Sequence, residues 1–268
     1  MSALVTSVDA FLGGKLTIEQ PKSGYRAGLD AVFLAASVIW PREQRPFCVL
    51  DVGAGVGTVG LCVARRCLDA QVTLLEREPQ LAGLARENIK RNALAERVRV
   101  IETALDASAA DLSACGLSAD SFDDVVANPP YHSQGQGTPA PNAMKAASHA
   151  MEETGLDAWV RFMARMAKPG GRVAMVHKAE ALPAVLAAFQ GRFGDMRVLP
   201  LYPRAGEPAS RIIVQATKGS RAQMVLLPGF TLHGEGNVFA GPSQHVLRDG
   251  AGVLMMTLAE VMQIKGSL

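Results

Sequence analysis

The chain has 268 residues, of which 49% are hydrophobic and 19% are charged, and its formal net charge at pH 7 is +2. This length suits one large α/β domain, whereas two full domains would be cramped. No apolar run reaches the roughly 18 residues that span a bilayer, and the first six residues lack the basic start and apolar core of a signal peptide. The four cysteines show no paired metal-ligand spacing. We therefore expect a cytoplasmic protein with reduced thiols, no metal and no membrane anchor.

The charges are unevenly distributed along the chain. Residues 161–221 carry 11 Lys and Arg against 3 Asp and Glu, whereas residues 101–160 carry 1 Lys against 9 Asp and Glu. A basic second half could form a face that follows a phosphate backbone beside a catalytic pocket. A solvated surface on which charges happen to segregate would give the same pattern, so both interpretations stay open.

Strand and helix patterns alternate after residue 46. Strands are predicted near residues 47–52, 71–76, 98–102, 123–128, 171–177, 196–202 and 210–217. Helices are predicted near residues 30–39, 57–68, 78–92, 155–167 and 180–190. This alternation indicates an α/β fold in which parallel strands are joined by crossover helices. Residues 232–250 have a loop-like composition, and an apolar helix is predicted from Val253 to Ile264.

A glycine-rich run follows the first of these strands. The strand at residues 47–52 leads into Asp-Val-Gly-Ala-Gly-Val-Gly at 51–57. Gly53 and Gly55 permit positive φ angles and a close approach of the backbone to a ligand. Glu76 ends the next strand, where its carboxylate could bind a ribose diol. Nicotinamide and flavin enzymes use similar glycines, but an acidic residue at the head of the run favours a cofactor without a pyrophosphate.

The strand predicted at residues 123–128 ends in the turn Asn128-Pro129-Pro130-Tyr131. An amino group on an aromatic ring or an amide shares its lone pair with a π-system and is a poor nucleophile. The side-chain carbonyl of Asn128 and the backbone carbonyl of Pro129 could accept its two N–H bonds and hold the nitrogen in line with an electrophile. Consecutive prolines stiffen the turn, and Tyr131 is placed to stack on the ring. The turn therefore predicts a reaction at a planar nitrogen.

The segment from His132 to Ala150 leaves this turn directly. It is rich in Gly, Gln, Ser and Pro and shows no periodicity. We interpret it as a mobile loop that covers the substrate, while an ordinary surface excursion is the alternative.

The glycine run and the Asn-Pro-Pro-Tyr turn together resemble S-adenosylmethionine-dependent methyltransferases of the class I fold, in the branch that methylates amino groups. Residues 24–36, 203–206 and 211–215 are similar to the bacterial tRNA1(Val) adenine-37 N6-methyltransferase family, so the resemblance covers nearly the whole chain. It implies a Rossmann-like, seven-stranded sheet, mostly parallel with an antiparallel last strand and with helices on both faces. It also implies one methyltransferase domain over residues 1–268: an N-terminal segment on the cofactor and substrate side (1–46), a core (47–217) and a C-terminal extension (218–268).

The resemblance further implies S-adenosylmethionine as the cofactor, no metal, and particular site residues. The catalytic residues are expected to be Asn128, Pro129 and Tyr131. The cofactor contacts are expected from Tyr25, Arg26, Asp30, Asp51, Gly53, Gly55, Glu76, Thr103, Ala104 and Asn128. Asp30 would also suit a helix N-cap, and Asp51 could anchor the glycine run through backbone N–H groups. Because Ala104 replaces the acidic residue common after the third strand, adenine recognition is expected to use backbone groups near Thr103 and Ala104.

We therefore expect transfer of a methyl group to N6 of an adenine in tRNA, with the base unstacked from a single-stranded loop. Arg204 and Arg211 are candidates for phosphate contacts, with ion pairing inside the fold as the alternative. A protein glutamine N5-methyltransferase is a rival, because an amide nitrogen poses the same chemical problem. DNA adenine methylation, a non-catalytic RNA-binding protein on the same fold and a pyridine-nucleotide oxidoreductase are less favoured. A monomer and a homodimer are both compatible with the sequence.

Overall fold

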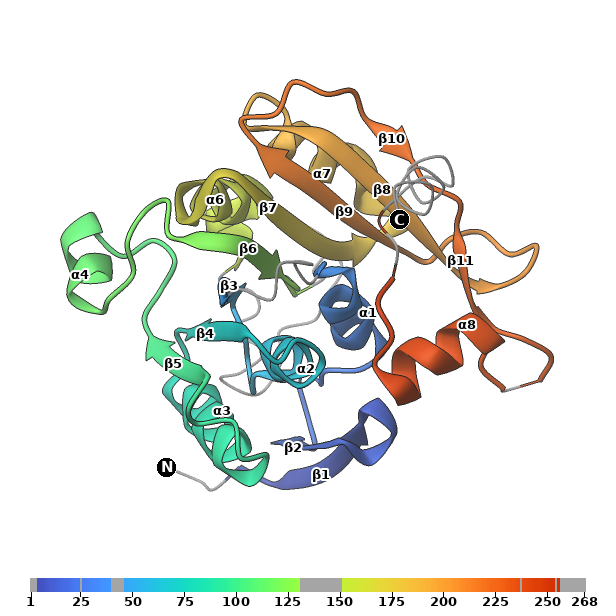
Figure 1. Ribbon diagram of the computed structural model, residues 1–268, viewed down its shortest axis with the longest axis horizontal. Coiled ribbons are helices and arrows are strands. Elements are labelled where there is room, and N and C mark those ends of the chain that lie inside the picture. Colours follow the sequence, from blue (N-terminus) through green and yellow to red (C-terminus); the bar gives the residue numbers. More distant parts are fainter. Residues whose placement is uncertain are drawn as a thin grey trace.

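The computed structural model describes residues 4–24, 26–39, 46–130, 151–236, 238–253 and 255, with no side-chain detail for residues 151–154. A central sheet organises these residues (Figure 1). Its strands are β3 (Phe47–Val52), β4 (Ala70–Glu76), β5 (Val98–Glu102), β6 (Phe122–Ala127), β7 (Ala167–Lys178), β8 (Phe193–Arg204), β9 (Arg211–Lys218), β10 (Val225–Leu226) and β11 (Phe230–His233).

The strand order of the sheet is β10-β8-β9-β7-β6-β3-β4-β5, and β11 also pairs with β8. Strands β3 to β7 run parallel to one another, whereas β9 lies antiparallel between β7 and β8. The predicted sheet, mostly parallel with an antiparallel seventh strand, is therefore confirmed. The short strands β10 and β11 were not predicted, because two and four residues are too few to show a periodic pattern.

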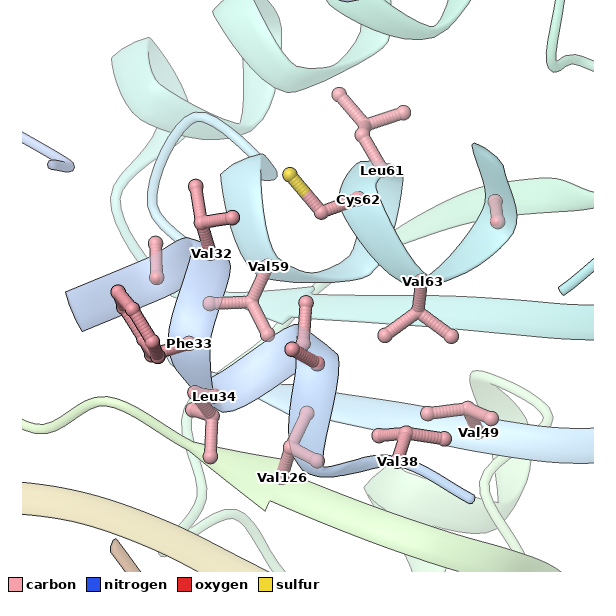
Figure 2. Close-up of a cluster of buried hydrophobic side chains, with 14 of the residues drawn as sticks. Val32, Phe33, Leu34, Val38, Val49, Val59, Leu61, Cys62, Val63 and Val126 are labelled. Carbon is pink, nitrogen blue, oxygen red and sulfur yellow. The ribbon is translucent and has the colours of Figure 1, made fainter. Parts of the chain in front are cut away.

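Helices cover both faces of the sheet. They are α1 (Leu29–Ser37), α2 (Thr58–Arg66), α3 (Pro79–Arg91), α4 (Ala109–Ala114), α6 (Met151–Met166), α7 (Leu182–Phe189) and α8 (Gly241–Gln244). Successive strand residues point to opposite faces, so β3 contributes Val49 to one core and Leu50 to the other. The first core lies under α1, α2 and α3, where Figure 2 shows side chains of α1 and α2 gathered around Val49 and Val126. The second core lies under α4, α6 and α7.

An N-terminal hairpin that the sequence did not predict packs beside α2 and α3 (Figure 1). Its strands β1 (Thr6–Phe11) and β2 (Leu16–Pro21) pair antiparallel as a separate two-stranded sheet. Leu16 and Ile18 alternate along β2 and point into the first core, where both side chains are almost fully buried.

The loop predicted at residues 232–250 is wrong in part. Helix α8 runs directly into a π-helical turn at His245–Asp249. Pro242 in the first turn favours a helix start, and Gly250 ends the segment with a φ of 76°. Val246 and Leu247 are buried against α1 and the tip of the hairpin. The helix predicted from residue 253 lies mostly outside the described residues.

Candidate cofactor and catalytic site

The predicted site residues meet at the carboxyl edge of the sheet. Strand β6 pairs with β3 so that Val52 lies opposite Ala127, and Gly53 and Asn128 follow directly on this pair. Glu76 closes β4, the neighbour of β3 on its other side. The chain moves from β3 to β4 and β5 in one direction and from β6 to β7 in the other, so β3 and β6 flank the topological switch point. Open α/β sheets bind their ligands at this place.

The glycine loop, residues 53–57, is packed on one side and open on the other. Gly53 has a φ of +64°, and a Cβ built on it would lie 2.3 Å from Cη2 of Trp159. Gly55 has a φ of +57°, but no atom lies within 4 Å of the position that its Cβ would take. Trp159 thus supports the loop from one side, while Gly55 borders open space in which a ligand could approach the backbone.

Glu76 holds the glycine loop through backbone N–H groups. Its side chain is buried, Oε2 accepts a hydrogen bond of 2.7 Å from Gly55 N, and Oε1 accepts bonds of 2.9 Å from both Arg77 N and Glu78 N. Burial raises the pKa of Glu76, and these hydrogen bonds oppose the rise. A carboxylate can accept about four hydrogen bonds, so Glu76 keeps the capacity to accept one more, from a hydroxyl donor.

Asp51 anchors the start of α2 rather than the glycines themselves. Its Oδ2 accepts a hydrogen bond of 2.9 Å from Gly60 N in the first turn of this helix. The side chain is 1% exposed, and burial raises its pKa to about 7. The bond from Gly60 opposes this rise, and the nearby charge of Glu76 adds to it. Asp51 therefore fixes where the glycine loop becomes a helix.

Asn128 and Pro129 are both buried where β6 ends, and Asn128 is 7% exposed. Strand β7 runs beside them, since Ala127 lies opposite Met175. His177, two residues further along β7, therefore lies at the same edge, and burial lowers the pKa of its imidazole. The predicted stacking residue Tyr131 and the segment 132–150 lie outside the described residues.

The comparisons with known proteins agree with this geometry. The Methyltransferase small domain family matches residues 33–181, more than half of the chain. The chain belongs to this family. It is an S-adenosylmethionine-dependent methyltransferase, and the expected resemblance at that level is confirmed.

Individual relatives carry more specific names. A protein of Aeromonas hydrophila, 28% identical over 208 residues, is named tRNA1(Val) (adenine(37)-N6)-methyltransferase; the match covers 75% of this chain and 80% of that protein. A Bacteroides thetaiotaomicron protein of the same name is 34% identical over 118 residues, which is 44% of this chain and 45% of that relative. A crystal structure described as a predicted O-methyltransferase from Agrobacterium tumefaciens has a TM-score of 0.69 and 27% identity, covering 84% of this chain and 98% of that one.

In this methyltransferase, the charged residues expected near the cofactor already have partners in the fold. Asp30 does not cap α1, because the N-cap position is taken by Gly28; instead its Oδ2 lies 2.9 Å from Nε of Arg211. Arg26 forms an ion pair of 2.7 Å with Asp9. Tyr25 lies outside the described residues. The expected Asp30 cap is therefore wrong, and Arg211 follows the alternative of pairing inside the fold.

The remaining candidates, Arg204, Thr103 and Ala104, form hydrogen bonds with backbone groups of other residues. Arg204 donates hydrogen bonds to the carbonyl oxygens of Gly234 and Gly236. Thr103 N donates a hydrogen bond of 3.1 Å to the carbonyl oxygen of Glu76, and Ala104 O accepts one of 3.2 Å from Ala107 N. Thr103 and Ala104 are half-buried at the end of β5, on the same sheet edge as Glu76.

The uneven charges of the sequence meet each other in three dimensions. Basic residues from 161–221 pair with acids from 101–160: Lys168 with Asp123, Arg172 with Asp124, Arg161 and Arg192 with Asp157, and Lys218 with Asp120. These residues form ion pairs with one another, so their uneven order along the chain is not in itself evidence of a phosphate-binding face. Across the described residues, we find neither a helix long and apolar enough to cross a membrane nor a metal-binding group of His, Cys, Asp or Glu side chains.

Two residues that contact the glycine loop were not indicated by any pattern in the sequence. Trp159 is 5% exposed, and its Nε1 is buried without a hydrogen-bond acceptor among the described residues. Asn88 of α3 is fully buried and binds the carbonyl of Val56 within the glycine loop. In the sequence Trp159 is one apolar position of a helix and Asn88 one polar position, and no motif connects either residue to a loop so distant along the chain.

Proposed function

We propose that this methyltransferase transfers a methyl group from S-adenosylmethionine to N6 of an adenine in tRNA. The observation that carries the proposal is the juxtaposition of the glycine loop with Asn128 and Pro129 at the switch point of the sheet. The names of the relatives from Aeromonas hydrophila and Bacteroides thetaiotaomicron support adenine in tRNA as the target. We further propose a cytoplasmic enzyme with a single catalytic domain over residues 1–268.

The residues at the edge fit the cofactor. The open space beside Gly55 admits a ligand against the backbone, and the buried Glu76 carboxylate is proposed to accept a ribose hydroxyl. Asp51 holds the loop-to-helix junction, and backbone groups of Thr103 and Ala104 are proposed to meet the adenine. Arg26 and Asp30, proposed for the methionine end with Tyr25, would have to share or exchange their present ion-pair partners. When bound, the cofactor supplies an electrophilic methyl group on a sulfonium.

Asn128 and Pro129 are proposed to orient the amino group of the base. The Oδ1 of Asn128 and the carbonyl oxygen of Pro129 accept its two N–H bonds, which directs the nitrogen lone pair toward the methyl carbon. The cofactor would supply the methyl group and leave as S-adenosylhomocysteine. The methylated nitrogen would then release its extra proton to solvent, so the turn would need to supply no dedicated general base. Tyr131 is proposed to stack on the extruded base.

Isotope labelling tests the target. The chain is incubated with S-adenosylmethionine carrying a labelled methyl group, together with either unmodified tRNA or total protein. We expect label in tRNA, recovered as N6-methyladenosine when the nucleosides are analysed by mass spectrometry. Label confined to protein, at glutamine side chains, would overturn the RNA target in favour of the glutamine N5 rival. No label in either substrate, with intact binding of S-adenosylhomocysteine, would contradict both.

A further inference from the structure

Two asparagines of one helix bind strand β2 as a partner strand would. Asn88 lies near the end of α3, and Asn92 lies one turn later at its C-cap. Asn92 Oδ1 accepts a hydrogen bond of 3.0 Å from Thr17 N, and its Nδ2 donates one of 2.8 Å to Thr17 O. Asn88 makes the same pair with Glu19, at 2.7 Å and 2.9 Å. Each amide thus satisfies both backbone groups of one residue of the hairpin.

The two asparagines differ in their second N–H bond. Nδ2 of Asn88 also donates a hydrogen bond of 3.0 Å to the carbonyl oxygen of Val56, in the middle of the glycine loop. Nδ2 of Asn92 instead donates one of 2.8 Å to the carbonyl oxygen of Asn88, within the helix. Only the Asn88 side chain therefore joins the hairpin to the glycine loop, although both are buried and both hold β2.

The hairpin also contacts the segment that precedes α1. Gln20 is buried, its Oε1 accepts a hydrogen bond of 3.0 Å from Ala27 N, and its Nε2 donates one of 2.9 Å to Asp9. Asp9 in turn forms the ion pair with Arg26. One small sheet therefore contacts both the glycine loop, through Asn88, and the segment that leads to Asp30.

We propose that Asn88 is a positioning residue that holds the glycine loop in its cofactor-binding conformation. Val56 lies between Gly55 and Gly57, which both have positive φ, and glycine loses more conformational freedom on ordering than any other residue type. Glu76 fixes the loop at Gly55 N, and Asn88 fixes it one residue later at Val56 O. A loop held at both points is ordered before the ligand arrives, which lowers the entropy cost of binding. The proposal rests on the assignment of the glycine loop to the cofactor.

Asn92 provides a matched control for the test. Asn88→Ala and Asn92→Ala each remove one strand-like pair of hydrogen bonds to β2, so both should lower the thermal stability of the full chain. Because one loop contact is lost only in Asn88→Ala, we expect this variant to bind S-adenosylhomocysteine about five- to tenfold more weakly, and Asn92→Ala within about twofold of wild type. The kcat of Asn88→Ala at saturating S-adenosylmethionine should stay within about threefold of wild type, while its KM rises.

Hydrogen exchange gives a readout that does not depend on catalysis. We expect faster amide exchange in the peptide covering residues 53–57 in Asn88→Ala than in Asn92→Ala. If either alanine variant does not fold, Asn88→Ser and Asn92→Ser are compared in the same way. Equal losses of affinity and equal exchange in the two variants would overturn the proposal. If the wild-type chain itself fails to bind S-adenosylhomocysteine, the assignment of the glycine loop fails, which is a separate and recognisable result.

Discussion

Buried carboxyl groups at the carboxyl edge of the sheet and further back in its strands are held in different ways. At the carboxyl edge, Asp51 and Glu76 accept hydrogen bonds from backbone N–H groups of the loop and of helix starts. In the first half of β6, Asp124 binds Arg172 of the adjacent strand β7 through both of its oxygens, at 2.9 Å and 2.8 Å. Burial raises the pKa at all three sites, but only Asp124 has a guanidinium that opposes the rise.

The kind of group that holds each buried carboxyl distinguishes the candidate site, with Asp51 and Glu76, from the structural ion pair of Asp124. A guanidinium cancels the charge of the carboxylate that it binds, whereas a backbone N–H fixes a carboxylate and leaves its net charge uncompensated. Buried carboxyl groups that are held without a cation and have raised pKa values are typical of binding and catalytic sites. Asp124 and Arg172 instead form an ion pair that stabilises the fold, and the two kinds of site should respond differently to substitution.

The largest loss of stability is expected from Arg172→Met. The Asp124 side chain is 4% exposed, so removal of the guanidinium leaves a buried carboxyl group without its partner, which costs about 3–5 kcal/mol. Urea unfolding of the variant and of wild type measures the difference. Lys178→Met is the control, because Lys178 and Glu180 form a longer ion pair of 3.5 Å in which the Glu180 side chain is 73% exposed. Loss of this exposed ion pair should cost less than about 1 kcal/mol. Equal effects of the two substitutions would contradict the structural role of the Asp124 pair.

Asn128→Ala should give the largest loss of activity. Removing an acceptor for the reacting nitrogen is expected to lower kcat by about 10² to 10³, the range seen when one preorganised group is removed from an active site. Single-turnover methylation of tRNA measures the rate, and calorimetry with S-adenosylhomocysteine should show an affinity close to that of wild type. Activity within a few fold of wild type would disprove the role of the turn.

The central sheet could be predicted because its strands are buried on both faces. Strand β3 was expected at residues 47–52 and is found there, since Phe47 to Leu50 form a short apolar run bounded by a turn. The hairpin could not be predicted, because the polar backbone of β2 is satisfied by Asn88 and Asn92, about 70 residues away in the sequence. A pattern within one segment contains no sign of such a partner.

For the candidate site, the position on the sheet could be predicted from the sequence, but the side-chain contacts could not. That Gly53, Glu76 and Asn128 would share one edge follows from the rule that parallel strands end together. Their contacts depend on packing between distant segments: Trp159 against Gly53, Gly60 N on Asp51, and Asp30 with Arg211. The charge pattern was ambiguous for a related reason, since a sequence gives the order of charges but not which of them meet.

A methyl group added to Gly53 should damage the carboxyl edge selectively. In Gly53→Ala the new Cβ would lie 2.3 Å from the Trp159 ring, and a φ of +64° is unfavourable for alanine. We therefore expect the variant to lose about 1–3 kcal/mol of stability and to bind S-adenosylhomocysteine more weakly. Thermal unfolding and calorimetry measure the two effects. Gly83→Ala in α3 is the control, since nothing lies within 4 Å of its Cβ position, and it should be neutral or slightly stabilising. Unchanged cofactor binding by Gly53→Ala would show that the loop can move away from Trp159 without consequence.

The smallest effect concerns pH and tests whether Asp51 is held without a cation. Its pKa in the folded chain is about 7, against an ordinary value of 3.8 for an aspartate, so between about pH 4 and pH 7 the folded state retains a proton that the unfolded state has released. Raising the pH through this window must therefore favour unfolding, by at most about 1.4 kcal/mol between pH 5 and pH 6. Asp51→Asn keeps an acceptor for Gly60 N and removes the ionisation, so its stability should fall less than that of wild type over the same interval. Urea unfolding of both proteins at pH 5, 6 and 7 gives the comparison. If the free energies of unfolding of the two proteins changed equally with pH, Asp51 would be ionised in the folded chain already at pH 5. A cationic partner or a more hydrated site would then have to stabilise its charge. Such a result would contradict the contrast drawn between Asp51 and Asp124.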